Sequence, residues 1–321
     1  MKKMLSALFA IPMFYLAACS PLVASIPEDA DRPEIRGFIN RVDYGYNTAY
    51  IFGSMHYGLE EWFPLSPIVE NAMTSADVFA FEVDFGLAED PALQERLEEL
   101  MRLPEGTTLS DLLPSETVEL MIQQLADLPG VYDAELFFSN LEEFTPVVVA
   151  EYILLNFIMP HIEIERVYSV DYYVLDFATS NNRPIIGLND IFVEHELLYN
   201  VPIDVQITMF DEDGFGDFQA IIDDLMGTDG FDDIVRGYET NDLELFRGDS
   251  LVQHSLYDEH RDNVYWNIRC NIFADEIARL LQETEEPTTF FVTIGAGHVA
   301  GPGKVLQLLE DMGFDLVPLW Q

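Results

Sequence analysis

The chain has 321 residues, a length typical of one or two domains, and 49% of them are hydrophobic. This composition excludes a disordered chain, which has too little apolar surface to offset the entropy lost on folding. The formal net charge is −43 at pH 7, from 58 acidic and 15 basic residues, and the lysines are Lys2, Lys3 and Lys304. Such a charge excludes a general nucleic-acid binder and a protein held electrostatically on anionic lipid.

The first twenty residues resemble a bacterial export signal. Two lysines precede an apolar run at residues 4–18, which is short for a membrane span and typical of a signal-peptide core. Leu-Ala-Ala-Cys at residues 16–19 resembles the lipobox, whose cysteine is lipidated and becomes the first mature residue. We therefore expect a lipoprotein signal peptide at residues 1–18, lipidation at Cys19 and a tether at residues 19–36. The protein would be extracytoplasmic and would contact the membrane only through its N-terminal lipid. Ordinary export with cleavage nearby, or an uncleaved anchor, is the alternative.

Strand patterns at both ends of the chain enclose a helical middle. Residues 37–44 and 48–52 predict a β-hairpin, residues 77–85 a buried strand, and residues 91–158 a helical region. Later patterns predict helices at 171–180, 191–199, 217–226, 261–282 and 304–312, and strands at 184–188, 288–294 and 317–319. We therefore expect a single α/β domain over residues 37–321, bordering on α+β. Its N- and C-terminal segments would form a mixed central sheet, with a large helical insertion between them.

Two histidines follow predicted strands in turns of small residues. His56 ends the run Gly-Ser-Met-His that begins at Gly53, and His298 ends the run Gly-Ala-Gly-His formed by Gly295, alanine, Gly297 and the histidine. Glycines let the backbone turn sharply and approach a ligand closely, and ligands of open α/β sheets bind at the carboxyl ends of strands. The positions predict two functional histidines, with hydrogen-bonded structural histidines as the alternative.

Glu82 is an unusual residue for the apolar strand that contains it, and Asp84 points to the same face of that strand. A carboxylate in this setting is paired, metal-bound or protonated, because burying an isolated charge is very costly. A structural ion pair with an arginine is the plain alternative. Two histidines and a carboxylate suffice to hold a divalent metal with an open coordination position. They suffice equally for general acid–base chemistry without a metal.

The remaining reactive side chains carry no predicted role. Cys270 lies in an apolar-periodic helix and is predicted to be a buried, inert thiol. The other histidines have no partners at ligand spacing and are predicted to be solvated or capping residues: His161, His195, His254 and His260.

The two Gly-x-x-His motifs, at residues 53–56 and 295–298, resemble the end motifs of the TraB/GumN (Tiki-like) family. The strand that carries Glu82 is similar to a third element of that family. The resemblance covers roughly residues 38–319 and departs at Asn189, where the family usually has a glutamate after Gly-Leu. Further similar stretches are Ser-Val-Asp at 169–171, Pro-Ile-Ile-Gly-Leu at 184–188, and Arg-Asp-Asn at 261–263 with Trp266.

The resemblance implies a divalent-metal-dependent protease, with manganese, cobalt or zinc as the metal and a peptide or protein as the substrate. On this hypothesis His56 and His298 are metal ligands or transition-state contacts, and Glu82 is a metal ligand or the base that activates water. Arg261 would steady an oxyanion or a substrate carboxylate, and Asn263 would donate a hydrogen bond in the same site.

Three other functions fit the same residues. The arrangement is also similar to that of erythromycin esterases, which implies a metal-free hydrolase with His56 as the base. It is similar to ChaN-like haem-binding lipoproteins, which implies a haem- or iron-binding protein without turnover. A binding module that sequesters a peptide is the third. In each case the large negative charge favours cationic peptides or metal ions near the site.

Overall fold

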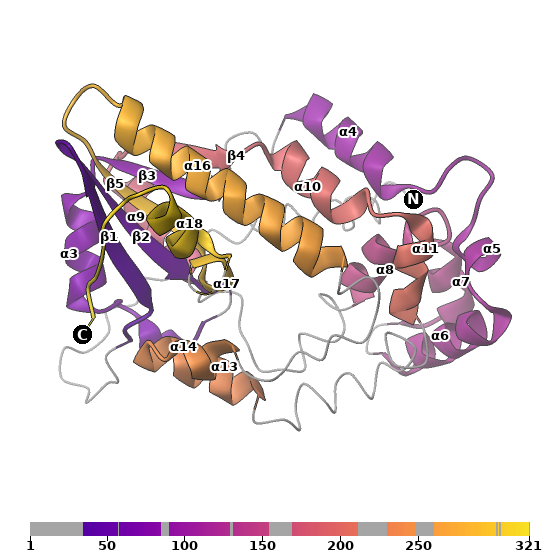
Figure 1. The fold of residues 1–321 in the computed structure, drawn as a ribbon. Helices are drawn as coiled ribbons and strands as arrows, with labels where there is room; N and C mark the ends of the chain where they lie inside the picture. The colour runs from indigo at the N-terminus through magenta and orange to yellow at the C-terminus, as the bar shows by residue number, and fades with distance from the viewer. Residues whose placement is uncertain are drawn as a thin grey trace.

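The computed structural model describes residues 35–56, 58–84, 90–128, 131–153, 169–210, 230–247, 260–299, 301 and 303–320. These residues form a six-stranded mixed sheet of order β4-β3-β5-β2-β1-β6, surrounded by helices (Figure 1). The architecture confirms the predicted α/β fold. The strands are β1 (Phe38–Tyr44), β2 (Asn47–Ser54), β3 (Val78–Val83), β4 (Ile185–Asn189), β5 (Thr289–Gly295) and β6 (Leu316–Pro318).

The register of the sheet gathers four strand ends at one edge. β1 and β2 form the predicted hairpin, in which Tyr44 pairs with Asn47 and Gly45 takes a φ of 60° in the turn. β2 pairs with β5, β5 with β3, and β3 with β4, all in parallel. The carboxyl ends of these strands therefore lie side by side, which is where ligands of such sheets bind. β1 and β6 extend the sheet on its antiparallel side.

Helices cover the sheet and bury its apolar residues. The long helix α16 (Asn267–Glu283) packs along the sheet with α18 (Val305–Asp311), and α3 (Pro67–Ser75) lies on the other side (Figure 1). The helix α9 (Val170–Ser180) contacts α3 through a hydrogen bond, in which the hydroxyl of Tyr173 donates to Oε1 of Glu70 at 2.7 Å. Fully buried aromatic and aliphatic side chains from both layers form the main core, among them Phe52, Phe79, Phe81, Phe273, Ile277 and Phe291.

The helical middle has an apolar cluster of its own, which includes Met121, Leu125 and Val147. A smaller cluster of Leu93, Leu97 and Ile191 joins this part of the chain to Val83 at the end of β3. The helices of this part lie away from the sheet in Figure 1, as the predicted insertion requires. They are α4 (Pro91–Met101), α5 (Leu109–Leu112), α6 (Ser115–Asp127), α7 (Ala134–Ser139), α8 (Pro146–Ile153), α10 (Ile191–Tyr199) and α11 (Ile203–Gln206).

The predicted helix over residues 261–282 begins as a π-helical turn, η7 (Arg261–Trp266), and continues as α16. Wider turns of this kind are frequent at functional sites. A four-residue helix, α17 (Ala296–Val299), follows β5 directly. The other described elements are η1 (Glu60–Trp62), η6 (Ile207–Phe210), α13 (Gly230–Thr240) and α14 (Leu243–Arg247).

Several predictions concern residues outside the described ranges: the signal peptide, lipidation of Cys19, most of the tether, and the helix over 217–226. The last two residues of the predicted tether already pack on the folded part, since Ile35 is buried and the N–H of Arg36 donates to the carbonyl oxygen of Glu239. Within the described ranges, none of the helices has the length and apolar character needed to cross a membrane.

Candidate active site at the carboxyl ends of the parallel strands

The structure brings three of the predicted site residues together. His56 follows β2, Glu82 lies near the end of β3, and His298 lies in α17 after β5. A Cβ atom added to Gly295 would lie 3.3 Å from Oε1 of Glu82, 3.7 Å from Cδ2 of His298 and 3.9 Å from Nε2 of His56. The three side chains therefore surround Gly295, and a side chain at that position would occupy the space between them.

The other two predicted turn glycines allow close packing around the same edge. A Cβ atom on Gly53 would lie 3.0 Å from Cα of Ala296, so glycine lets β2 approach the start of α17. A Cβ atom on Gly297 would lie 3.4 Å from the ring of Trp266. These contacts bring η7 and α17 against the strand ends.

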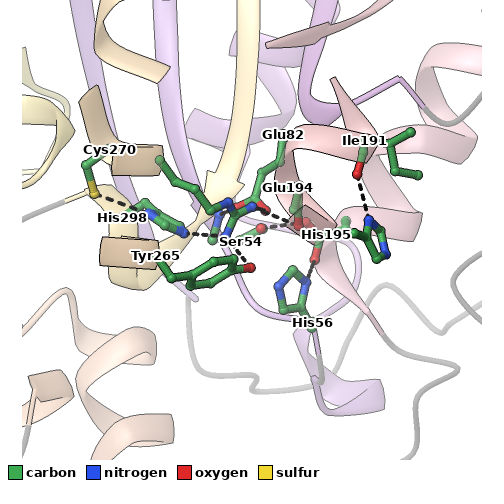
Figure 2. A network of polar contacts seen from close by, with 12 residues as sticks. Ser54, His56, Glu82, Ile191, Glu194, His195, Tyr265, Cys270 and His298 are labelled. Atoms are coloured by element: carbon green, nitrogen blue, oxygen red, sulfur yellow. Dashed lines mark hydrogen bonds and ion pairs between the residues drawn. The ribbon is translucent and has the colours of Figure 1, made fainter. Parts of the chain in front are cut away.

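His56 is oriented by a buried aspartate on α9. Its Nδ1 atom lies 3.0 Å from Oδ2 of Asp171, whose other oxygen, Oδ1, accepts a 2.6 Å hydrogen bond from the hydroxyl of Ser54. Asp171 is 7% exposed, whereas 41% of the His56 side chain is exposed. The Nε2 atom of His56 would lie 3.9 Å from a Cβ atom on Gly295, on the side of Glu82 and His298. Figure 2 shows His56 at the edge of the polar network.

The surroundings of His56 favour its protonated form. Partial burial acts to lower its pKa, but the charge of Asp171, the hydrogen bond to that carboxylate and the charge of Glu82 outweigh burial. Together they raise the pKa of His56 from 6.5 to about 9. His56 is therefore an imidazolium at neutral pH, and it donates through both ring nitrogens.

Both carboxylate oxygens of Glu82 accept hydrogen bonds. Oε1 accepts from the backbone N–H of Gly295 at 2.7 Å, and Oε2 accepts from Nη2 of Arg269 at 2.5 Å. Burial acts to raise the pKa of Glu82, but the charge of Arg269 and the Gly295 hydrogen bond hold it well below its ordinary value. Glu82 is therefore a stable carboxylate and a weak base.

Arg269 of α16 is the centre of the network and is 3% exposed. Its Nη1 atom donates to the hydroxyl oxygen of Tyr265 at 2.8 Å and to Nε2 of His298 at 3.0 Å. Its Nη2 atom, besides contacting Glu82, lies 3.1 Å from Oε1 of Glu194 on α10. One guanidinium thus joins η7, α17, β3 and α10.

His298 is a buried, neutral ring. Because Arg269 has no acceptor, Nε2 of His298 must accept, and the ring proton lies on Nδ1, which is 3.2 Å from Sγ of Cys270. Burial, with the nearby charge of Arg269, holds the pKa of His298 well below its ordinary value. The rings of Trp266 and Phe273 flank it, with centroids 4.3 Å and 5.2 Å away. Cys270 is buried, as predicted, and burial raises the pKa of its thiol.

The remaining predicted residues are less involved. Asn263 has an exposed side chain on η7, and the side chain of Arg261 lies outside the described residues. Asn189 ends β4 opposite Val83, and its buried Nδ2 atom has no hydrogen-bond partner among the residues that the structure describes. In place of the family glutamate at 189, Glu194 contributes a carboxylate from the next helix.

The prediction that His195 is solvated or capping is wrong. His195 is 7% exposed, its Nδ1 atom lies 2.6 Å from the carbonyl oxygen of Ile191, and burial lowers its pKa. It faces away from Glu82 on α10 (Figure 2). The pattern of α10 hid this burial, since apolar residues lie on all sides of that short helix.

Sequence reasoning missed five residues of the network: Ser54, Asp171, Glu194, Tyr265 and Arg269. Asp171 was within reach, because it belongs to the Ser-Val-Asp stretch that resembles the family. Arg269 also carried a signal, since it lies on the buried stripe of α16 with Cys270 and Phe273. A charged residue on such a stripe needs a buried partner.

The arrangement does not fit a metal ion held by His56, Glu82 and His298. Oε2 of Glu82 and Nε2 of His298 both accept hydrogen bonds from the positively charged Arg269, so a cation at these atoms would meet the guanidinium charge. The second nitrogen of His298 faces Cys270. Across the described ranges, His, Cys, Asp and Glu side chains do not gather in a group of three or more able to hold a metal.

The carboxyl edge of this α/β sheet therefore holds an oriented histidine beside a buried Glu–Arg ion pair. A sequence model of the TraB/PrgY/gumN family matches residues 38–318. The match spans most of the chain, so the chain belongs to the TraB/PrgY/gumN family, which confirms the resemblance seen in the two Gly-x-x-His motifs. Neither the curated proteins nor the solved structures include a match to this chain.

Proposed function

We propose that this protein is a metal-free hydrolase of peptide or related acyl bonds in which His56 transfers the proton. The observation that carries the proposal is the pairing of His56 with Asp171: a half-exposed imidazole whose Nδ1 is fixed by a buried carboxylate. This is the arrangement that orients a histidine for acid–base catalysis. The geometry disfavours a metal-dependent reaction, because Oε2 of Glu82 and Nε2 of His298 both accept hydrogen bonds from Arg269.

The protonation state of His56 sets its role. With a pKa of about 9, His56 begins the reaction as an acid at neutral pH, in contrast to the base expected from the resemblance to erythromycin esterases. Nε2 donates its proton to the leaving nitrogen or oxygen as the bond to the acyl carbon breaks and a water oxygen bonds to that carbon. One proton of the attacking water returns to Nε2 of His56 and restores the imidazolium, and the new carboxylic acid releases the other proton to solvent. Asp171 stabilises the imidazolium and holds the ring in place.

Glu82, Arg269 and His298 support the site without exchanging protons. Arg269 stays charged and Glu82 stays ionised, so they form a fixed ion pair beside His56. The buried ion pair and the neutral ring of His298 hold the strand ends in one geometry. Such preorganisation is a major part of enzymatic rate enhancement.

The substrate class follows from charge, and the location follows from the N-terminal sequence. With 58 acidic and 15 basic residues, the chain attracts cationic peptides and repels acidic ones.

Lipidation at Cys19 would place the domain on the outer side of a bacterial membrane, where exported peptides and proteins are available. Mass spectrometry of the N-terminal peptide from membrane fractions, compared with Cys19→Ser, tests that location.

Turnover tests the proposed reaction. We would incubate the protein with a peptide library rich in lysine and arginine, at pH 7, and identify the products by mass spectrometry. Cleavage by the wild type and a loss of at least about tenfold in His56→Gln are expected. Binding of peptides or haem without any product would contradict the hydrolase and favour a binding protein. Cleavage that persists in His56→Gln would contradict the role of the histidine.

A further inference from the structure

The side chain of Tyr265 is held by Arg269 at both its ring and its hydroxyl. Tyr265 lies in the π-helical turn η7, four residues before Arg269. Nη1 of Arg269 donates to the hydroxyl oxygen of Tyr265 at 2.8 Å, and the guanidinium carbon lies 4.7 Å from the centre of the Tyr265 ring. The ring of Trp266 packs edge-on against the same tyrosine, with centroids 6.0 Å apart. The position of the hydroxyl is therefore set by the protein itself.

The contact with Arg269 leaves the hydroxyl of Tyr265 as a hydrogen-bond donor. A phenolic hydroxyl can accept through its oxygen and donate its one hydrogen. The oxygen accepts from Arg269, whereas none of the residues that the structure describes accepts a hydrogen bond from Tyr265. Burial raises the pKa of Tyr265 well above its ordinary value, so the hydroxyl keeps its hydrogen at neutral pH. A hydrogen bond received from a cation also polarises the O–H group and strengthens it as a donor.

The Nη hydrogens of Arg269 are all directed at groups of the protein. Nη1 donates to Tyr265 and to His298. Nη2 contacts the carboxylates of Glu82 and Glu194. Arg269 is 3% exposed, and its remaining N–H group, on Nε, is buried. Tyr265 is partly exposed, so its hydroxyl is the group through which the charge of Arg269 acts on a bound molecule.

Other hydrogen-bond donors of the network are used within the protein. The backbone N–H of Gly295 and the hydroxyl of Ser54 both donate to carboxylates of the network. The ring N–H of His298 faces a buried thiol. Among the described residues of this network, the hydroxyl of Tyr265 is therefore a neutral donor that the protein does not use itself. Figure 2 shows this hydroxyl on the side of the network where His56 lies.

Hydrolysis of an acyl bond needs a hydrogen-bond donor at the carbonyl oxygen, because the attack of water turns this oxygen into an oxyanion. We propose that Tyr265 is a catalytic residue whose hydroxyl donates a hydrogen bond to this oxygen, while the proton stays on the tyrosine. One bound acyl group would then meet Tyr265 at its carbonyl oxygen and His56 at its leaving atom. This inference rests on the proposed hydrolase function. The family resemblance assigned the oxyanion to Arg261, four residues earlier in the same turn.

The kinetics of Tyr265→Phe, which removes the hydroxyl and keeps the ring, provide the first test. With a peptide that the wild type cleaves, kcat should fall at least about tenfold while KM changes less than about threefold, because the oxyanion forms only in the transition state. Tyr46→Phe is the matched control, since Tyr46 is exposed in the hairpin turn at the other end of β2, and it should leave kcat and KM unchanged. A folded Tyr265→Phe protein with the kcat of the wild type would overturn the proposal.

A phosphonate ligand tests the donor without turnover, because its tetrahedral anion resembles the oxyanion. The probe is a lysine dipeptide in which a phosphonate replaces the amide, and the ordinary dipeptide is its control. In calorimetric titrations, Tyr265→Phe should raise the Kd of the phosphonate at least about tenfold and that of the ordinary dipeptide less than about threefold. Equal effects on the two ligands, or a wild-type protein that does not bind the phosphonate, would overturn the proposal.

The two readouts separate this inference from the hydrolase proposal. If no peptide is cleaved, the hydrolase proposal fails, and the phosphonate affinities still decide whether Tyr265 is the oxyanion donor. If peptides are cleaved and Tyr265→Phe keeps the wild-type kcat, the hydrolase stands and the role of Tyr265 is wrong. If Tyr265→Phe does not fold, 3-fluorotyrosine at position 265 replaces it. Its more acidic hydroxyl is a stronger donor, so kcat and phosphonate affinity should equal or exceed those of the wild type, and a fall in both would overturn the proposal.

Discussion

The coupling between His56 and Asp171 gives the sharpest quantitative prediction. Asp171→Asn keeps the size of the side chain and removes its charge, so the imidazolium of His56 loses the partner that stabilises it most. The structure raises the pKa of His56 from 6.5 to about 9, and each unit corresponds to about 1.4 kcal/mol. Because 41% of the His56 side chain is exposed, solvent screening reduces the contribution of Asp171 to about 1–2 kcal/mol. We therefore expect the pKa of His56 to fall by about 1 unit or more in Asp171→Asn.

Nuclear magnetic resonance of the histidine rings measures this pKa directly. The Cε1–H signal of His56 is identified by its absence in His56→Gln and is followed from pH 5 to pH 10. Ser54→Ala is the matched control, because it removes a hydrogen bond to the same carboxylate without removing charge. The His56 pKa should stay near 9 in the control.

Two results would refute the reasoning on His56. One is a wild-type pKa close to 6.5, which would show that Asp171 does not stabilise the imidazolium. The other is a pKa in Asp171→Asn that stays within half a unit of the wild-type value. The same pKa shift predicts how stability depends on pH. The His56–Asp171 pair contributes fully to the free energy of unfolding below about pH 6.5, and this contribution is lost as pH rises through about 9.

Three further predictions concern stability and metal binding. Arg269→Gln should lower the free energy of unfolding by about 3 kcal/mol or more, since it leaves Glu82 buried and unpaired. Arg279→Gln, on the exposed face of α16, is the control and should lower the free energy of unfolding by less than about 1 kcal/mol. Equal losses for the two variants in urea titrations would contradict the role of Arg269 as the buried partner of Glu82. Gly295→Ala should cost about 1–3 kcal/mol, because the new methyl group would lie 3.3 Å from Oε1 of Glu82; unchanged stability would argue against this close packing. Manganese, cobalt or zinc should leave the Tm of the wild type unchanged, whereas a site filled at 100 times its Kd would add about 2.7 kcal/mol and raise the Tm by several degrees.

The fold and the two histidines of the site were predictable from the sequence, because the patterns that indicate them involve only neighbouring residues. Apolar strand patterns at 77–85 and 288–294 and glycines next to His56 and His298 reflect short-range backbone requirements. The register then aligns the strand ends, so that residues far apart in sequence meet at one edge. The helical region after β3 was equally clear, because its apolar residues keep a helical period.

The partners of these residues were not predictable, because they depend on long-range packing. Arg269 and Glu82 are 187 residues apart, and His56 and Asp171 are 115 residues apart. The apolar stripe of the 261–282 helix indicates that Arg269 turns inward but does not indicate its partner, and Arg261 was predicted only from the resemblance. Glu194 carries no local signal either, since its carboxylate joins the network only through its contact with Arg269 in the folded protein.

The most direct test of the central claim is the peptide cleavage rate of protein stripped of metal by a chelator, compared with the same protein supplied with manganese, cobalt or zinc. A metal-free site centred on His56 predicts equal rates, both lost in His56→Gln. A rate that falls with the chelator and returns with one of these metals would contradict the account, because the ion would then need the atoms of Glu82 and His298 that Arg269 holds.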